Sequence, residues 1–259
     1  MYKTQENNYN INMEKELSGK TAFIIGGSGG LGKNISEALA KEGLNLIIHG
    51  SNLEKLENLK NQLNQLNSKS KIEVFHKKFD EVGISNQDFL ELTNYIKSVD
   101  ILIICYGPFL QKELHATSLE EWNKIVYWNY TFPGQMISSA LQSMMKKKFG
   151  RILVFGGTRT YSINGYKTNS VYAGAKTALC SLVKSCALEY AKYGITCNAI
   201  LPGFVETEYL SQEVKNSLKD KMPQGELIEG KSIAEAALFL IKNKSLNGVL
   251  LNVDEGWNP

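Results

Sequence analysis

The sequence lacks the features that would indicate a membrane, secreted or nucleic-acid-binding protein. Among its 259 residues there is neither a signal peptide nor an apolar run long enough to span a bilayer, which predicts a cytoplasmic protein without a membrane partner. An excess of one charge is also missing, because 29 basic residues are balanced by 26 acidic ones and the signs are mixed, so nothing favours nucleic-acid binding. The four cysteines form no Cys-x-x-Cys pair, and we expect buried, reduced thiols and no metal site.

The chain also lacks the signs of several domains. It has no internal repeat, no linker and no break in composition, and 43% hydrophobic residues is typical of a soluble globular protein. Residues 1–16 are polar and rich in asparagine, and we expect them to form a flexible extension. Residues 17–259 are then predicted to form one domain with a large core.

A glycine-rich stretch organises the first part of this domain. The apolar run Thr21–Ile25 leads into residues 26–32, Gly-Gly-Ser-Gly-Gly-Leu-Gly, and a helical pattern follows as far as Gly43. Glycines at a helix N-terminus let bare backbone N–H groups approach a pyrophosphate, which side chains would hold away. A tight turn without a ligand has the same pattern, but the strand before it and the helix after it favour a dinucleotide site.

Six further apolar runs predict strands at residues 44–49, 72–75, 101–105, 151–155, 195–201 and 248–253. Helical patterns lie between them, over residues 53–66, 89–96, 118–145 and 172–193, and after a capping box at residues 232–235. This alternation predicts an α/β fold, a single Rossmann-type, doubly wound, parallel seven-stranded sheet with helices on both faces. Ligands of such sheets bind beyond the carboxyl ends of the strands, where the strand order reverses.

A tyrosine and a lysine provide the candidate chemistry. Tyr172 and Lys176 are four residues apart on a predicted helix and therefore lie on one face. An ammonium near a phenol favours the phenolate, so we expect Lys176, with a positively charged nicotinamide, to lower the pKa of Tyr172 from about 10 towards neutrality. Such a tyrosine can give a proton to a carbonyl oxygen or take one from an alcohol. The spacing alone is weak evidence, and its position shortly after the fifth strand is what favours this interpretation.

Taken together, Gly26-x-x-x-Gly30-x-Gly32 and Tyr172-x-x-x-Lys176 resemble the motifs of the short-chain dehydrogenase/reductase family. The resemblance covers nearly the whole chain, and within the family it is greatest to 3-oxoacyl-carrier-protein reductases. It implies an enzyme that transfers a hydride between a nicotinamide dinucleotide and a carbonyl or alcohol carbon of a small molecule. It also implies a homotetramer or homodimer.

The resemblance further implies site residues. Tyr172 would exchange the proton, Lys176 would hold the nicotinamide ribose, and Asn129 would support Lys176 through water. Asp80 would bind the adenine amino group, although Asp80 and Asn129 each also fit a turn residue or a satisfied buried amide. The implied cofactor site follows the glycine turn and the ends of the strands: Gly26, Ser28, Gly29, Gly30, Leu31, Gly32, Ser51, Asn52, Asp80, Tyr106, Gly107, Tyr172, Lys176, Pro202, Gly203, Val205 and Thr207.

The chain departs from the family pattern after strands four and five. Where the family usually has Asn-Asn-Ala-Gly, residues 104–107 read Ile-Cys-Tyr-Gly, so we expect apolar packing in place of hydrogen bonds, with Tyr106 near the cofactor or substrate. The family's substrate-orienting serine is also missing. Counting from strand five places it at Gly157, and counting back from Tyr172 places it at Arg159, so the loop carries about two extra residues. We expect the hydroxyl of Thr158 to replace it, with those of Thr160 and Ser162 in reserve.

Residues 49–52, His-Gly-Ser-Asn, end the second strand and bear on the choice of cofactor. An acid there would bind the ribose hydroxyls of NAD and repel a 2′-phosphate, and no acid is present. Ser51 and Asn52 could donate to a phosphate, although the arginine common in NADP enzymes is missing. NADP(H) is therefore favoured over NAD(H).

Two functions remain open from the sequence. The first is an oxidoreductase that reduces a 3-oxoacyl thioester or another ketone, with the aromatic segments 106–110, 161–166 and 204–210 around an apolar or flat substrate. The second is a nucleotide-binding regulator that kept the fold and lost turnover, which the missing serine favours. The joint presence of Tyr172, Lys176 and Asn129 favours the first.

Overall fold

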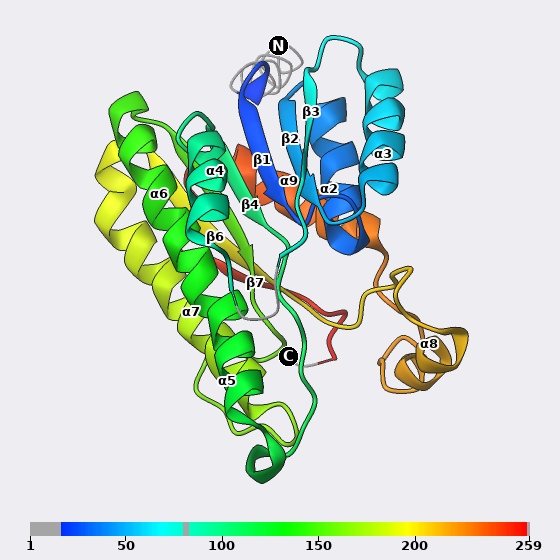
Figure 1. Cartoon of the computed structure of the whole chain (residues 1–259). Coiled ribbons are helices and arrows are strands. Elements are labelled where there is room, and N and C mark those ends of the chain that lie inside the picture. Colours follow the sequence, from blue (N-terminus) through cyan, green and yellow to red (C-terminus); the bar gives the residue numbers. More distant parts are fainter. Residues whose placement is uncertain (1–16, 80–82, 258–259) are drawn as a thin grey trace, which may run out of the picture.

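The seven predicted strands pair into one parallel sheet, in the order β3-β2-β1-β4-β5-β6-β7 (Figure 1). The computed structural model describes residues 17–79 and 83–257. The predicted extension at residues 1–16 therefore lies outside the described residues. The strands are β1 (Thr21–Ile25), β2 (Asn45–Gly50), β3 (Ile72–His76), β4 (Ile101–Ile104), β5 (Gly150–Phe155), β6 (Ile195–Pro202) and β7 (Leu250–Val253).

Helices cover both faces of the sheet, as predicted (Figure 1). One face carries α2 (Gly30–Lys41), α3 (Leu53–Leu66) and α9 (Gly230–Lys242), and the other carries α4 (Asn86–Ile96), α5 (Leu119–Val126), α6 (Phe132–Lys147) and α7 (Ser170–Tyr190). The side chains of β1 show why both faces need a cover. Ala22 and Ile24 belong to the core under α2, whereas Phe23 and Ile25 belong to the core under α6.

Shorter elements complete the chain. A short helix, α8 (Gln212–Lys219), lies apart from the sheet at the edge of the molecule (Figure 1). Two 3₁₀ turns span Leu114–Ala116 and Ala191–Tyr193. None of the helices in residues 17–79 and 83–257 is long and apolar enough to cross a bilayer. Within the same residues, no group of three His, Cys, Asp or Glu side chains could hold a metal ion, and all four cysteines are free thiols.

Two predicted helices differ in detail. The long helix expected over residues 118–145 begins with the predicted Ser118–Glu121 capping box, but a π-turn, Tyr127–Thr131, separates α5 from α6. The second capping box, at residues 232–235, is wrong. Helix α9 starts three positions earlier, at Gly230, and its N-cap, Glu229, makes no side-chain hydrogen bond. Gly230 packs closely on α2, because a Cβ there would lie 2.4 Å from Asn34 Nδ2.

The strand order places the ligand-binding end of the sheet. From β1 the chain proceeds outward to β2 and β3, and then it returns to the other side of β1 with β4. The order therefore reverses between β1 and β4, and their carboxyl ends lead into the glycine turn and into Cys105-Tyr106-Gly107. A crevice at this switch point is where ligands of doubly wound sheets bind.

Candidate active site

The glycine turn after β1 has a conformation that requires glycine. Gly26 and Gly30 have positive φ angles, +79° and +51°. Gly32 is required for a different reason, since a Cβ there would lie 2.1 Å from the carbonyl oxygen of Gly26. Helix α2 can therefore start directly behind β1, with its first N–H groups exposed at the turn.

An acidic side chain already lies at the start of α2. The N-cap, Gly29, provides no side-chain cap, and the N–H of Gly30 donates to both carboxylate oxygens of Glu208, at 3.1 and 3.2 Å. Burial acts to raise the pKa of Glu208, but hydrogen bonds from backbone N–H groups, including that of Gly30, outweigh it and lower the pKa. The carboxylate stands in for an anionic ligand, so the residues of this turn fit a pyrophosphate.

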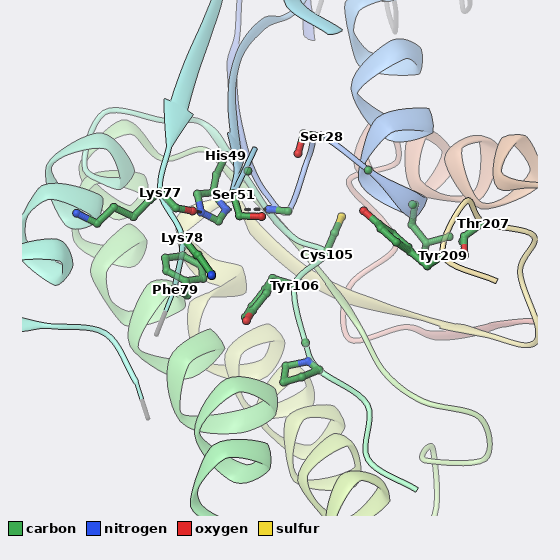
Figure 2. Close-up of a pocket in the computed structure, with 17 residues that line it drawn as sticks. Ser28, His49, Ser51, Lys77, Lys78, Phe79, Cys105, Tyr106, Thr207 and Tyr209 are labelled. Carbon is green, nitrogen blue, oxygen red and sulfur yellow. Dashed lines mark hydrogen bonds between the residues drawn. The ribbon is translucent and has the colours of Figure 1, made fainter. Parts of the chain in front are cut away.

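A cavity of about 500 Å³, here called the glycine-turn cavity, opens beside this turn (Figure 2). Its lining combines the turn with the ends of β2, β3 and β4 and with the segment after β6: Gly26, Ser28, Gly29, Gly30, Leu31, His49, Gly50, Ser51, Lys77, Lys78, Phe79, Cys105, Tyr106, Gly107, Pro108, Thr207 and Tyr209. Figure 2 shows Thr207 and Tyr209 at one end, and Lys77, Lys78 and Phe79 at the other.

Nine of the seventeen expected cofactor residues line this cavity, and Tyr172, Pro202 and Gly203 line a second cavity described below. Gly32, Asn52, Lys176 and Val205 line neither cavity. The side chain of Asn52 accepts a hydrogen bond from the N–H of Lys55, so it caps α3. Val205 pairs in a short bridge with Ile228. Asp80 lies outside the described residues. Ser51 does line the cavity, and so does Lys78, which sequence reasoning missed although it follows directly from β3.

His49, another residue that sequence reasoning missed, connects three segments around the cavity. Its Nδ1 accepts a hydrogen bond from the N–H of Gly26 at 3.2 Å, so its Nε2 carries the proton and donates to the carbonyl of Lys77 at 3.0 Å. Burial, opposed by the bond to Lys77 and assisted by the charge of His76, lowers the pKa of His49 to about 4. The imidazole is therefore neutral at physiological pH and holds the glycine turn against β2 and β3.

Aromatic packing follows β4, as expected from the residues Ile-Cys-Tyr-Gly at 104–107. The ring of Tyr106 contacts those of Phe79 and Trp128 edge to face, with both pairs of centroids 5.2 Å apart. Phe79 in turn stacks on Trp128 and, at 4.4 Å, on His49. Tyr106 lines the cavity, as expected of a residue near the cofactor.

Two candidate catalytic residues, Asn129 and Lys176, meet beside Gly107, which lines this cavity. Asn129 is fully buried, and its Nδ2 donates to the carbonyls of Pro108 and Ile125 at 2.9 and 3.0 Å. Its Oδ1 has no hydrogen-bond partner within the described part of the chain. A Cβ on Gly107 would lie 2.5 Å from that oxygen and 3.1 Å from Lys176 Nζ, so both polar groups converge on one point. The π-turn, Tyr127–Thr131, places Asn129 beside Gly107.

The expected pKa of Tyr172 is wrong for the chain by itself. Burial raises the pKa of Tyr172 to about 12, and burial also lowers the pKa of Lys176 to about 8. The ammonium lies 5.7 Å from the centroid of the Tyr172 ring and donates to the carbonyl of Phe155 at 2.7 Å. Lys176 is thus engaged with a neutral carbonyl, and desolvation dominates at the phenol.

A second cavity, of about 650 Å³ and here called the Tyr172 cavity, opens beside Tyr172. Its lining includes Thr158, Tyr172, Pro202 and Gly203, with apolar walls contributed by Phe109, Phe204, Leu210 and Trp257. The rings of Phe109 and Tyr172 pack edge to face at 4.9 Å, and those of Phe204 and Trp257 lie 4.2 Å apart. The tyrosine therefore lines a largely apolar cavity.

The structure distinguishes the candidates for the missing hydroxyl. Gly157 takes the serine's place beside the tyrosine, since a Cβ there would lie 3.3 Å from Tyr172 Cε1. The Oγ1 of Thr160 is buried, bonded to both the N–H and the carbonyl of Gly157, and Ser162 bonds to Asn164. Thr158 and Thr160 both line the Tyr172 cavity, and the hydroxyl of Thr158 donates to the carbonyl of Pro202 at 3.2 Å. Because Thr158 is partly exposed and Thr160 is buried, Thr158 remains our prediction for the missing hydroxyl.

Comparisons with known proteins agree with this geometry. The family model described as short chain dehydrogenase matches residues 20–218. The chain is 28% identical over 249 residues to the 3-oxoacyl-(acyl-carrier-protein) reductase FabG of Aquifex aeolicus, covering 94% of this chain and 99% of the relative. It is 32% identical over 248 residues to the enzyme of the same name from Rickettsia bellii, covering 93% and 98%.

Solved structures share the fold. A short-chain type dehydrogenase/reductase from Mycobacterium ulcerans superposes with a TM-score of 0.82 at 20% identity, covering 93% of this chain and 90% of that one. A short-chain dehydrogenase/reductase from Serratia marcescens gives a TM-score of 0.80 at 23% identity, covering 94% and 99%.

Proposed function

The chain belongs to the short-chain dehydrogenase/reductase family and is an oxidoreductase, and from that premise we propose that it uses NADP(H) to reduce the carbonyl group of a small ketone or 3-oxoacyl thioester. One observation carries the proposal. Tyr172 lines the cavity with apolar walls, and Lys176 and the unpartnered Oδ1 of Asn129 converge on Gly107, which lines the glycine-turn cavity. A cavity for the cofactor and an apolar cavity for the substrate thus adjoin one group of residues that contains the proton donor.

The chain's own residues perform the proton transfer. The dinucleotide, when bound, supplies the hydride. Because burial raises the pKa of Tyr172 to about 12, its phenol is protonated at neutral pH and is ready to donate to a carbonyl oxygen. Lys176 would hold the nicotinamide ribose and Thr158 the carbonyl oxygen, whereas Asn129 would act through a water bound to its Oδ1.

The preference for NADP(H) is supported by the charge of the glycine-turn cavity. No acidic residue lines it among the described residues, and Ser51 and Lys78 lie at the end of β2 and β3. Lys77 is less available there, because it pairs with Asp88 and Glu91. At the ends of β2 and β3, a 2′-phosphate could therefore accept hydrogen bonds from a hydroxyl and an ammonium group. A free ribose diol would have no carboxylate there to accept its hydrogen bonds.

The substrate class follows from the second cavity and from the relatives. The apolar walls suit a hydrocarbon chain, and several relatives are named 3-oxoacyl-(acyl-carrier-protein) reductases. We also propose a homotetramer or homodimer. Apolar side chains on the surface of the α5–α7 layer support it, since Leu119 is 70% exposed, Leu188 86% and Trp122 40%.

The test is the oxidation of NADPH, followed optically, with a panel of simple ketones and 3-oxoacyl thioesters. We expect turnover of at least one class with NADPH and slower turnover with NADH. Tight NADPH binding without turnover of any carbonyl would support the regulator instead. Size-exclusion chromatography with light scattering tests the assembly, and a monomer at micromolar concentration would refute it.

A further inference from the structure

We propose that the carbonyl substrate carries an anionic group, a carboxylate or a phosphate, which Arg159 binds at the mouth of the Tyr172 cavity with the help of Lys167 and Lys221. The inference rests on the proposed function, because it names the substrate class of the same site. Three observations carry it: the charge of the cavity, the lack of partners for its cations, and the way the loop holds Arg159.

The charged residues that line the Tyr172 cavity are all basic. They are Arg159, Lys167 and Lys221, and no aspartate or glutamate lines the cavity among the described residues. They come from two separate parts of the chain, the loop after β5 and the turn after α8. A cavity lined by charges of one sign attracts and orients ligands of the opposite charge.

These cations have no acidic partner within residues 17–79 and 83–257, although neighbouring lysines do. Lys215 of α8 pairs with Glu206 at 2.8 Å, and Lys219 of the same helix pairs with Glu226. Arg159, Lys167 and Lys221 form no such pair there, so no carboxylate of the described residues competes with a ligand for them.

The loop holds Arg159 in a defined place. Its φ of +62° is left-handed, which is unfavourable for a residue with a Cβ. The carbonyl of Arg159 accepts a hydrogen bond from Asn164 Nδ2 at 2.8 Å, and its guanidinium lies 6.0 Å from the ring centroid of Tyr166. The Tyr166 hydroxyl in turn donates to the carbonyl of Thr158 at 3.2 Å.

This arrangement gives the two ends of a substrate separate partners. Thr158 and Arg159 are consecutive, so the loop presents a hydroxyl and a guanidinium to the same cavity. A guanidinium binds carboxylate or phosphate with two parallel hydrogen bonds. The apolar walls of the cavity would hold the hydrocarbon between the carbonyl and the anion, with the carbonyl towards Tyr172.

The experiment compares charged and neutral forms of the same ketone. A series of methyl-ketone carboxylic acids of increasing chain length is assayed beside the methyl esters and beside ketones that carry a phosphate at the same carbon. For each probe, kcat/KM is measured with NADPH, and Kd is measured by calorimetry. The proteins are the wild type, Arg159→Gln, and Lys244→Gln, which removes one positive charge from an exposed residue that lines neither cavity.

We expect the best acid or phosphate to exceed its neutral ester about tenfold in both kcat/KM and affinity, as a charged hydrogen bond at a partly exposed site provides. Arg159→Gln should bring the ratio close to one, and Lys244→Gln should leave it unchanged. The anion with the larger ratio identifies the group. Equal values for acid and ester in the wild type, or a ratio that survives in Arg159→Gln, would overturn the inference.

The same measurements distinguish failure of the anion site from failure of the reductase activity. Reduction of esters and acids at equal rates, with equal affinities, leaves the reductase standing and refutes the anion site. Tight binding of the acid that is lost in Arg159→Gln, without reduction of any probe, supports the anion site and refutes the reductase.

Discussion

Glu208 is expected to compete with the cofactor, because its carboxylate accepts the Gly30 N–H that a pyrophosphate would use. The contact comes from the segment after β6, and its neighbour Tyr209 lies across the turn, where a Cβ on Gly29 would be 2.1 Å from the Tyr209 hydroxyl. An incoming dinucleotide must displace both side chains. Removing the charge of Glu208 should therefore increase affinity for the cofactor.

The size of the effect follows from the exposure of the contact. A carboxylate at a solvent-exposed helix N-terminus stabilises its position by roughly 0.3–1 kcal/mol. Because Glu208 is exposed, solvent screens the charge, and the upper end of that range corresponds to about a fivefold change in Kd. Glu208→Gln should lower the Kd for NADPH by two- to fivefold, as the fraction of binding-competent molecules rises.

Fluorescence titration with NADPH measures the effect, with Glu235→Gln as a charge-matched control on the exposed side of α9. The lowered pKa of Glu208 also determines how the effect on NADPH affinity changes with pH. A carboxyl whose pKa is lowered below its ordinary value of 4.5 makes this contact above that pH and loses it as pH falls through the lowered pKa. The difference between wild type and Glu208→Gln should persist across neutral pH and disappear only in acid. An unchanged or weaker affinity in Glu208→Gln would refute the competition.

Four further results are expected. Tyr172→Phe should abolish turnover and leave the Kd for NADPH within a few-fold, so a variant with most of its activity would contradict the proton-donor role. Thr158→Val should lower kcat by roughly 10²–10³, and Thr158→Ser should leave kcat nearly unchanged. A Thr158→Val variant with the kcat of the wild type would show that the cavity orients the carbonyl without a hydroxyl. Ser51→Asp should make NADH the tighter cofactor, and equal Kd values in the wild type would exclude a phosphate contact. Since the pKa of His49 is lowered from 6.5 to about 4, unfolding in urea should show stability lost as pH falls from 6.5 towards 4, by about 2 kcal/mol at pH 5. His49→Gln should lack that loss.

The fold was predictable because its signals are local. Each strand is a short apolar run and each helix has a periodic apolar face, so the sheet, its parallel direction and its covering helices follow from residues close together in sequence. The glycine turn was predictable for the same reason. The start of α9 was not, because the capping box predicted at Ser232 does not form and the N-cap, Glu229, makes no side-chain hydrogen bond.

The site was predictable only where a motif fixes it. The positions of Tyr172, Lys176 and Asn129 relative to one another follow from helix spacing and family resemblance. The pKa of Tyr172 did not follow, because burial outweighs a lysine that donates to the Phe155 carbonyl instead. Arg159 and Glu208 gave no sequence signal, since their roles depend on which way a loop folds.

The departures from the family pattern have a common physical explanation. The glycine turn is held by His49, through the Gly26 N–H and the carbonyl of Lys77. The polar residues usual after β4 are absent, and Tyr106 packs in their place against Phe79 and Trp128. In each case the compensating groups come from other strands and helices, far away in sequence. A motif read along the chain therefore shows the loss but not the replacement, and a missing motif residue is weak evidence for lost activity until the packing around it is known.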